Sequence, residues 1–158
     1  MAQGRISLLV DSPLRDLAIV YRAVPADLRK QINKATKAEA QPIWKTETAE
    51  RATTRIQQRV LVDTAKVGVT NRNVLLRAGG GKRAALQSAA EFGRPASAPI
   101  RSRSKRGKAY TRTTGSLFGE RERRGKVVFP ASRASISRFA SLWIQTTIRT
   151  LHEAGEKV

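Results

Sequence analysis

The chain contains no cysteine and a single histidine, His152. Disulfide bonds are therefore excluded, as are metal sites built from thiolates or several imidazoles. A lone histidine near the end of the chain also gives no recognisable Cys-His or Ser-His-Asp constellation. We expect neither a metal ion nor a cofactor.

Aromatic residues are scarce, at 5% of 158 residues, although 40% of the chain is hydrophobic. The length fits a single domain over residues 1–158. Its core must consist mostly of Leu, Ile, Val and Ala. A core this thin often depends on oligomerisation for part of its stability, so we expect the chain to associate.

Long apolar runs are absent. No stretch approaches the roughly 20 residues that a membrane span needs. The first residues, Met1 to Arg5, do not form the apolar segment of a signal peptide. We expect a soluble protein made in the cytoplasm, with no membrane contact.

Acidic residues are few: 12 Asp and Glu stand against 31 Lys and Arg, which gives a net charge of +19. Twenty-one of the cations are Arg, whose planar fork bonds two oxygens of a phosphate or carboxylate at once. This balance favours nucleic acid or acidic protein surfaces as partners. The alternative is a generic solubilising surface.

The positive charge is concentrated in the middle of the chain. Residues 1–63 carry +4, residues 64–126 carry +13 and residues 127–158 carry +2. Within the middle segment, residues 94–126 are rich in Gly, Ser, Thr and Pro and have little to bury, which predicts a long, mobile basic loop. Its candidate contacts with a polyanion or partner are Arg94, Arg101, Arg103, Lys105, Arg106, Lys108, Arg112, Arg121, Arg123 and Arg124. Either the loop is an arm that touches a phosphate backbone or a neighbouring subunit, or it is a disordered insertion.

The N-terminal half predicts a helical segment over residues 13–58, preceded by a short strand over residues 6–10. Asp11 or Ser12 followed by Pro13 is typical of a helix start, and Leu14, Leu17, Val20 and Tyr21 keep helical spacing. Pro25 predicts the start of a longer helix with Leu28, Ile32, Ala35 and Ile43 on one face. Pro42 should bend that helix or break it in two.

Short strands are expected over residues 60–93. The candidates are 60–62, 66–70 and 73–77, with a turn at Asn71 and Arg72 between the last two. Gly79 to Gly81 predicts a break. The Ala-rich segment 84–92 permits a helix, but we favour a strand, for the reason given with the family resemblance below. Residues 126–129 predict one more strand.

The C-terminal segment 127–158 contains the clearest helix. Its apolar residues recur at three- and four-residue spacing, with Gly155 at the expected end. The predicted core face includes Ile136, Phe139, Trp143, Ile144, Ile148 and Leu151. The whole pattern predicts an α+β fold: N-terminal helices and a long C-terminal helix packed on a small, mainly antiparallel sheet, with a long basic loop.

No enzyme signature is present. The Gly79–Arg83 segment fails the phosphate-loop pattern, because Leu76 and Arg83 stand where a Gly and a hydroxyl residue are needed. Glu91, Glu120 and Glu122 are candidate acid–base carboxylates, but the Arg residues beside Glu120 and Glu122 favour salt bridges. Zinc-finger spacing is also absent, and the basic loop has one aromatic residue, Tyr110. Contact with DNA should therefore involve phosphates and be insensitive to sequence.

The order of these features resembles a known family. Short strands lead to Glu91-Phe92-Gly93, a variable basic loop follows, and Phe129-Pro130-Ala131 opens the final helix. This order is similar to the tail-completion, or head–tail connector, proteins of long-tailed bacteriophages, over roughly residues 13–155. In that family the Glu-Phe-Gly motif ends a strand, which is why we favour a strand at 84–92. The family's Thr-Gly-x-Leu segment lies earlier than Thr114–Leu117 does here, so it assigns these residues no role.

The resemblance implies a non-catalytic structural virion protein, assembled in the host cytoplasm and located in the neck. It implies a ring of six or twelve copies that contacts the connector or stopper proteins and the tail tube or terminator, with weak, nonspecific contact to the DNA in the channel. The alternatives are a tail terminator, a free-standing nonspecific nucleic-acid-binding protein, and an enzyme with an unrecognised site.

Overall fold

The computed structural model describes residues 6–7, 19, 21–71 and 73–156. It is an α+β fold, as the sequence predicts. The helical elements are α2 (Ala26–Arg51), α3 (Arg55–Gln57), the π-helical turn η1 (Gln58–Val62), the 3-10 helix η2 (Gly81–Leu86), α4 (Gln87–Phe92), the 3-10 helix η3 (Gly115–Leu117) and α5 (Val128–Gly155). The strands are β1 (Ile6–Ser7), β2 (Lys66–Val69), β3 (Val74–Arg77), β4 (Pro99–Arg103) and β5 (Ala109–Thr113).

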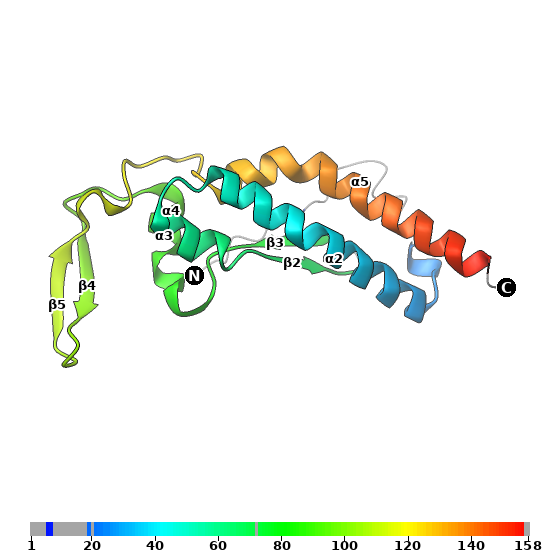
Figure 1. The fold of residues 1–158 in the computed structure, drawn as a ribbon, viewed down its shortest axis with the longest axis horizontal. Coiled ribbons are helices and arrows are strands. Elements are labelled where there is room, and N and C mark those ends of the chain that lie inside the picture. Colours follow the sequence, from blue (N-terminus) through cyan, green and yellow to red (C-terminus); the bar gives the residue numbers. More distant parts are fainter. Residues whose placement is uncertain (1–5, 8–18, 20, 72, 157–158) are drawn as a thin grey trace.

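The two long helices α2 and α5 pack along each other and define the long axis of the molecule (Figure 1). A stripe of residues at four-residue spacing is buried on α2: Ile32, Thr36, Ala40, Trp44 and Thr48. Trp44 meets Phe139 of α5 edge-on, and Tyr21 meets Trp143 in the same way. These aromatic residues are among the largest buried side chains of a core that otherwise consists of aliphatic residues and Ala.

Threonine fills much of the remaining helix interface. Thr48, Thr146, Thr147 and Thr150 are buried, and each hydroxyl donates to the backbone carbonyl four residues earlier. Because that bond is made within the helix itself, burying the hydroxyl leaves no unmet donor. A chain poor in aromatic residues therefore still closes a helix pair.

The prediction that Pro25 opens a long helix is confirmed, since α2 begins directly after it. The expected face is only partly right: Ile32 is buried, whereas Leu28, Ala35 and Ile43 are half-buried. The prediction that Pro42 could break the helix in two is wrong. Pro42 and Ala38 both lie on the exposed face of α2, so water can bond the Ala38 carbonyl that loses its helical partner.

Helix α2 ends at Arg51, and a new helical turn starts at Arg55, so helical structure reaches the expected Gln58 with one break. The Thr54 hydroxyl accepts from the Gln57 backbone N–H, while the Gln57 side chain accepts from the Thr54 N–H. This capping box leads directly into η1. Residues 60–62 are therefore helical, and the prediction of a strand there is wrong. Three consecutive apolar residues fit a short strand as well as a helical turn, and here all three are buried side chains of a helical turn.

The main sheet has three antiparallel strands in the order β1-β3-β2. Strands β2 and β3 confirm the predicted pair over 66–70 and 73–77, and the Thr70 N–H donates to the Asn73 carbonyl across the expected turn. Val67 and Leu76 point to the core from opposite strands. The strand over residues 6–10 is seen at Ile6–Ser7. The predicted helix start at residues 11–13, with Leu14, Leu17 and Val20, lies outside the described residues, while Tyr21 is helical and buried.

The strand predicted over residues 84–92 is wrong: the segment is helical throughout, as η2 and α4. Its composition explains the difference, because four of its nine residues are Ala, the strongest helix former. The short strand predicted over residues 126–129 is also wrong, since α5 begins at Val128.

Helix α5 confirms the C-terminal prediction. Phe139 and Trp143 are buried, and Ile136, Ile144 and Leu151 are half-buried against the core. Ile148 does not belong to the core face, because it is 59% exposed. The packed face turns instead through Thr146, Thr147 and Thr150, so a hydrophobic spacing rule that skips Thr selects the wrong residue. Among the described residues, no helix is long and apolar enough to cross a bilayer.

Candidate polyanion-contacting arm

The arm, residues 94–126, is not the structureless loop that the sequence predicts. It contains the antiparallel hairpin of β4 and β5, which extends from one end of the helix pair (Figure 1). Alternation of apolar and polar side chains is weak in this segment, so its composition resembled disorder. Ordered strands in a segment this basic raise the question of how the arm is attached.

A buried carboxylate fixes the start of α5 beside the arm. Glu91 is 3% exposed, and its oxygens accept from the backbone N–H groups of Val127 (3.3 Å), Val128 (2.8 Å) and Phe129 (3.0 Å). A helix leaves its first four N–H groups without partners. The fourth position here is Pro130, which has no N–H, and Ala131 makes the first intrahelical bond, to Val127.

Glu91 therefore caps α5 completely, from a position 36 to 38 residues earlier in the chain. A negative charge at a helix N-terminus is further stabilised by the helix dipole. The glutamate considered as a catalytic acid in the sequence has both oxygens engaged in this cap.

The residues of the two family-like motifs meet at the same place. The Phe92 and Phe129 rings lie 5.4 Å apart. Gly93 has a φ of 73°, and a Cβ there would collide with the Glu120 carbonyl. Gly125, at a φ of 78°, leaves room for the Glu91 carboxylate and the Phe129 ring. We call these residues, with Glu91, the junction.

Backbone hydrogen bonds join the outgoing and returning segments of the arm. The Lys126 N–H donates to the Glu91 carbonyl (2.9 Å) and the Glu122 N–H to the Phe92 carbonyl (2.8 Å). The Arg94 N–H donates to the Gly119 carbonyl (3.2 Å). The Lys126 ammonium also donates to the Phe118 carbonyl, so this cation helps to hold the base of the arm, where the two segments meet.

Thr114 closes the foot of the hairpin. It is 2% exposed, and its hydroxyl donates to the Pro95 and Ala96 carbonyls. Its N–H donates to the Ala98 carbonyl (2.9 Å), and the next N–H, of Gly115, donates to Ala96. The sequence assigned Thr114 no role, because nothing local distinguishes a buried threonine from the exposed ones around it.

The hairpin itself, Pro99–Thr113, packs mainly against itself. Every residue of β5 is exposed, and in β4 only Ile100 and Ser102 are half-buried. The register pairs Arg101 with Thr111 and Ile100 with Arg112. Because directly paired residues share a face, Arg101 and Arg103 lie on one face, and Arg112 lies with Ile100 and Tyr110 on the other.

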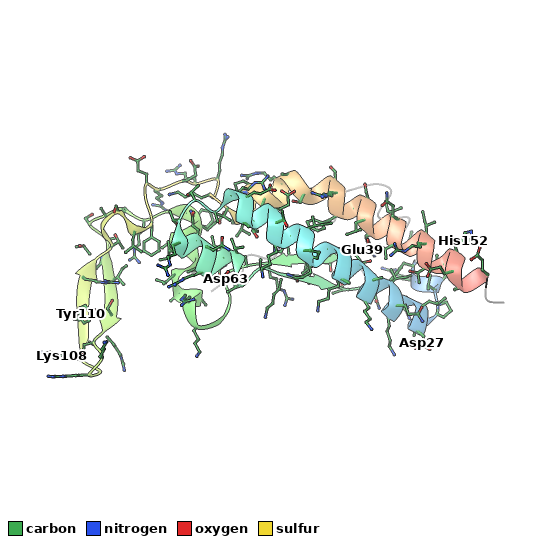
Figure 2. All side chains as sticks on the ribbon, in the orientation of Figure 1. Asp27, Glu39, Asp63, Lys108, Tyr110 and His152 are labelled. Atoms are coloured by element: carbon green, nitrogen blue, oxygen red, sulfur yellow. The ribbon has the colours of Figure 1, made fainter. Side chains whose placement is uncertain are left out.

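The hairpin tip is closed by Ser104 and Gly107. The Ser104 N–H donates to the Lys108 carbonyl, and its hydroxyl accepts from the Lys108 N–H (3.1 Å). Gly107 has a φ of 81°, which the turn requires. Figure 2 shows Lys108 and Tyr110 at this far end of the molecule, opposite His152 and Asp27.

Six of the ten predicted contact residues lie on the hairpin, and all six are exposed: Arg101, Arg103, Lys105, Arg106, Lys108 and Arg112. The hairpin has no acidic residue, and among the described residues none of these cations forms an ion pair. The helix pair differs, since Arg138 and Arg149 of α5 pair with Glu47 and Glu39 of α2. The cationic excess of the arm is thus uncompensated within the subunit.

The other four predicted contact residues lie at the base of the arm. Arg121, Arg123 and Arg124 are exposed on the returning segment. Arg94 is half-buried, and its guanidinium donates to the Pro99 carbonyl, so it also orients the hairpin. The predicted residues therefore form two groups, at the hairpin and at its base.

The described residues contain no group of three or more acidic or histidine side chains that could hold a metal ion. Comparison with family models, with curated proteins and with solved structures gave no match.

Proposed function

We propose that this chain is a structural virion protein of a long-tailed bacteriophage, which forms a ring of six or twelve copies in the neck. The ring joins the head portal or connector to the tail tube and surrounds the DNA channel. The proposal assigns the chain no catalytic step and no cofactor.

The observation that carries the proposal is the exposed cationic hairpin on a fixed base. An isolated two-stranded hairpin is only marginally stable in water, and in this one every residue of β5 and three of the five residues of β4 are exposed. Its six cations also repel one another without a counter-charge. A neighbouring subunit or a nucleic acid would relieve both conditions, which supports a function in an assembly.

The contact with DNA should be weak, because a channel must let DNA pass. The affinity that six cations have for phosphates falls steeply with salt. Log affinity falls by about 0.9 per log unit of salt concentration for each phosphate neutralised. Contact of this kind is insensitive to sequence and allows sliding.

Native mass spectrometry and electron microscopy of the purified protein, alone and with its connector and tail proteins, test the proposal. We expect closed rings with one copy number. A protein that stays strictly monomeric and binds no phage component would contradict it. A ring found only at the end of the tail tube would indicate the tail terminator instead.

A free-standing nonspecific nucleic-acid-binding protein is the second candidate, and the net charge of +19 favours it. It predicts DNA or RNA binding that persists near physiological salt, where nonspecific binding typically has a Kd of about 1 to 100 μM. Loss of all binding by about 150 mM salt would exclude it.

A further inference from the structure

A hollow of about 540 Å³ lies where α2 passes the free edge of β2, apart from the arm. Lys37 and Gln41 of α2 line it, together with Lys66 and Gly68 of β2 and Arg77 of β3. Three of these residues are cations, and the lining contains no acidic residue.

Two cations of the hollow, Lys66 and Arg77, repel each other. Lys66 and Arg77 are directly paired across the two strands, so they point to the same face of the sheet. Like charges in this position destabilise a sheet. Within the described part of the chain, neither of them nor Lys37 forms an ion pair. An anion bound in the hollow would remove this repulsion.

The floor of the hollow is fixed, and it is closed to another strand. The Gln41 amide donates to the Ala65 carbonyl (2.9 Å) and accepts from the Val67 N–H (2.9 Å). The side chain thereby occupies the edge positions that an added strand would pair with. The Trp44 indole also donates to the Arg77 carbonyl, which holds the backbone behind that cation. A small anionic group fits this geometry better than an extended peptide.

We infer that this hollow is a second anion site, which binds a phosphodiester of a polynucleotide backbone. Three cations in one open hollow exceed what a single carboxylate neutralises, whereas a polynucleotide brings successive charges. The inference rests on the proposed function in that it takes DNA as the neighbouring polyanion. In Figure 1 the hairpin extends toward the side of the molecule on which β2 and β3 lie, away from α5.

The test compares two double variants of the full chain with the same change in charge. Lys66→Gln with Arg77→Gln removes two cations of the hollow, and Lys45→Gln with Arg55→Gln removes two exposed cations outside it. Binding to a random-sequence DNA duplex is followed by fluorescence anisotropy across a salt series. We expect the slope of log affinity against log salt to shrink by about one to two in the first variant and to change little in the second. Equal slopes for both variants would overturn the inference.

A single Lys37→Gln variant, on a different element, keeps the test valid if the sheet variant fails to fold. It should reduce the slope by about one.

Polyglutamate serves as the competing probe. Loss of polyglutamate binding in the hollow variants with DNA binding intact would show a site for acidic protein and overturn the inference. Native mass spectrometry on the same samples separates the two proposals. Rings with an unchanged slope reject only the second site, and a changed slope without rings rejects only the neck ring.

Discussion

At the scale of single residues, the attachment of the arm depends on Glu91. Its carboxylate replaces the helix partners of three N–H groups, and Pro130 removes the need for a fourth. In the sequence, Glu91 and Pro130 belong to separate motifs with no visible relation, because the capping bonds span 36 to 38 residues. Only the fold brings the motifs together.

Replacing Glu91 by Ala should lower the free energy of unfolding by about 3 kcal/mol, because three buried N–H groups lose a charged acceptor. Urea unfolding measures this change. Glu120→Ala is the matched control, since Glu120 is exposed and should change stability by less than about 0.5 kcal/mol. A Glu91 variant as stable as its control would refute the capping role.

Two glycines at positive φ allow the stability cost of backbone strain to be measured apart from the cost of a steric clash. Gly107→Ala should cost about 1–2 kcal/mol, the strain of a left-handed alanine, because nothing lies near its added methyl group. Gly93→Ala should cost clearly more, since its Cβ also meets the Glu120 carbonyl. Thermal and urea unfolding of both variants give the comparison. Equal costs would show that the junction is looser than described.

Tyr21, a core residue, makes the free energy of unfolding depend on pH. Burial raises its pKa above the ordinary value of 10.0, and the nearby Arg29 offsets only part of that rise. The folded protein thus holds the phenol proton more tightly than the unfolded chain does. Its contribution to stability is complete below pH 10 and is lost as pH rises through the raised pKa.

The free energy of unfolding of the wild type should therefore fall above pH 10 more steeply than that of Tyr21→Phe. Urea titrations at a series of alkaline pH values measure the difference. Parallel curves for the two proteins would contradict the buried, protonated phenol. The variant also loses the bonds from the phenol to the Arg29 carbonyl and Asn33, so only the slope with pH is compared.

At the scale of elements, the long helices and the β2–β3 pair were predictable, and the other short elements were not. Helix α5 follows from apolar spacing around Phe139 and Trp143, and β2 and β3 follow from two short apolar runs on either side of a turn. The strand predicted over residues 60–62 is wrong because a short apolar run fits either a strand or a buried helical turn. Over residues 84–92 the composition permits a helix, and only the family resemblance favours a strand. The helical state of residues 60–62 is set by tertiary packing, because Val60 and Leu61 pack against Ala90 and Val127.

The sequence predicts where the positive charge of the candidate site lies, but it does not predict the hairpin that carries this charge. The sequence placed the cations on residues 94–126, but the hairpin depends on the Thr114 foot and the Gly107 turn, which local composition does not indicate. Ordered strands in the arm mean that its cations are held at defined positions on two faces.

Because the hairpin packs mainly against itself, its removal should leave the body intact. Replacing residues 99–113 by a short Gly-Ser linker should change the free energy of unfolding of the remaining protein by less than about 1 kcal/mol. The same variant should lose most of its DNA affinity at low salt. Circular dichroism melts and anisotropy measure the two effects. Unfolding of the body on removal of the hairpin would assign the hairpin a structural role within the subunit.

At the scale of the whole molecule, the described structure is elongated, and its positive charge is unevenly distributed along its length. Ion pairs join the two long helices α2 and α5. The cations of the hairpin at one end of the molecule form no ion pair within the described residues. This division suits a subunit that packs side by side with copies of itself while it presents positive charge to a polyanion.

The most direct test is electron cryomicroscopy of the assembled particle that contains this protein. The account predicts that residues 99–113 lie against DNA in the channel or against a neighbouring subunit, with density for the whole hairpin. Hairpins that project into bulk solvent in every copy, with neither protein nor nucleic acid in contact, would contradict it.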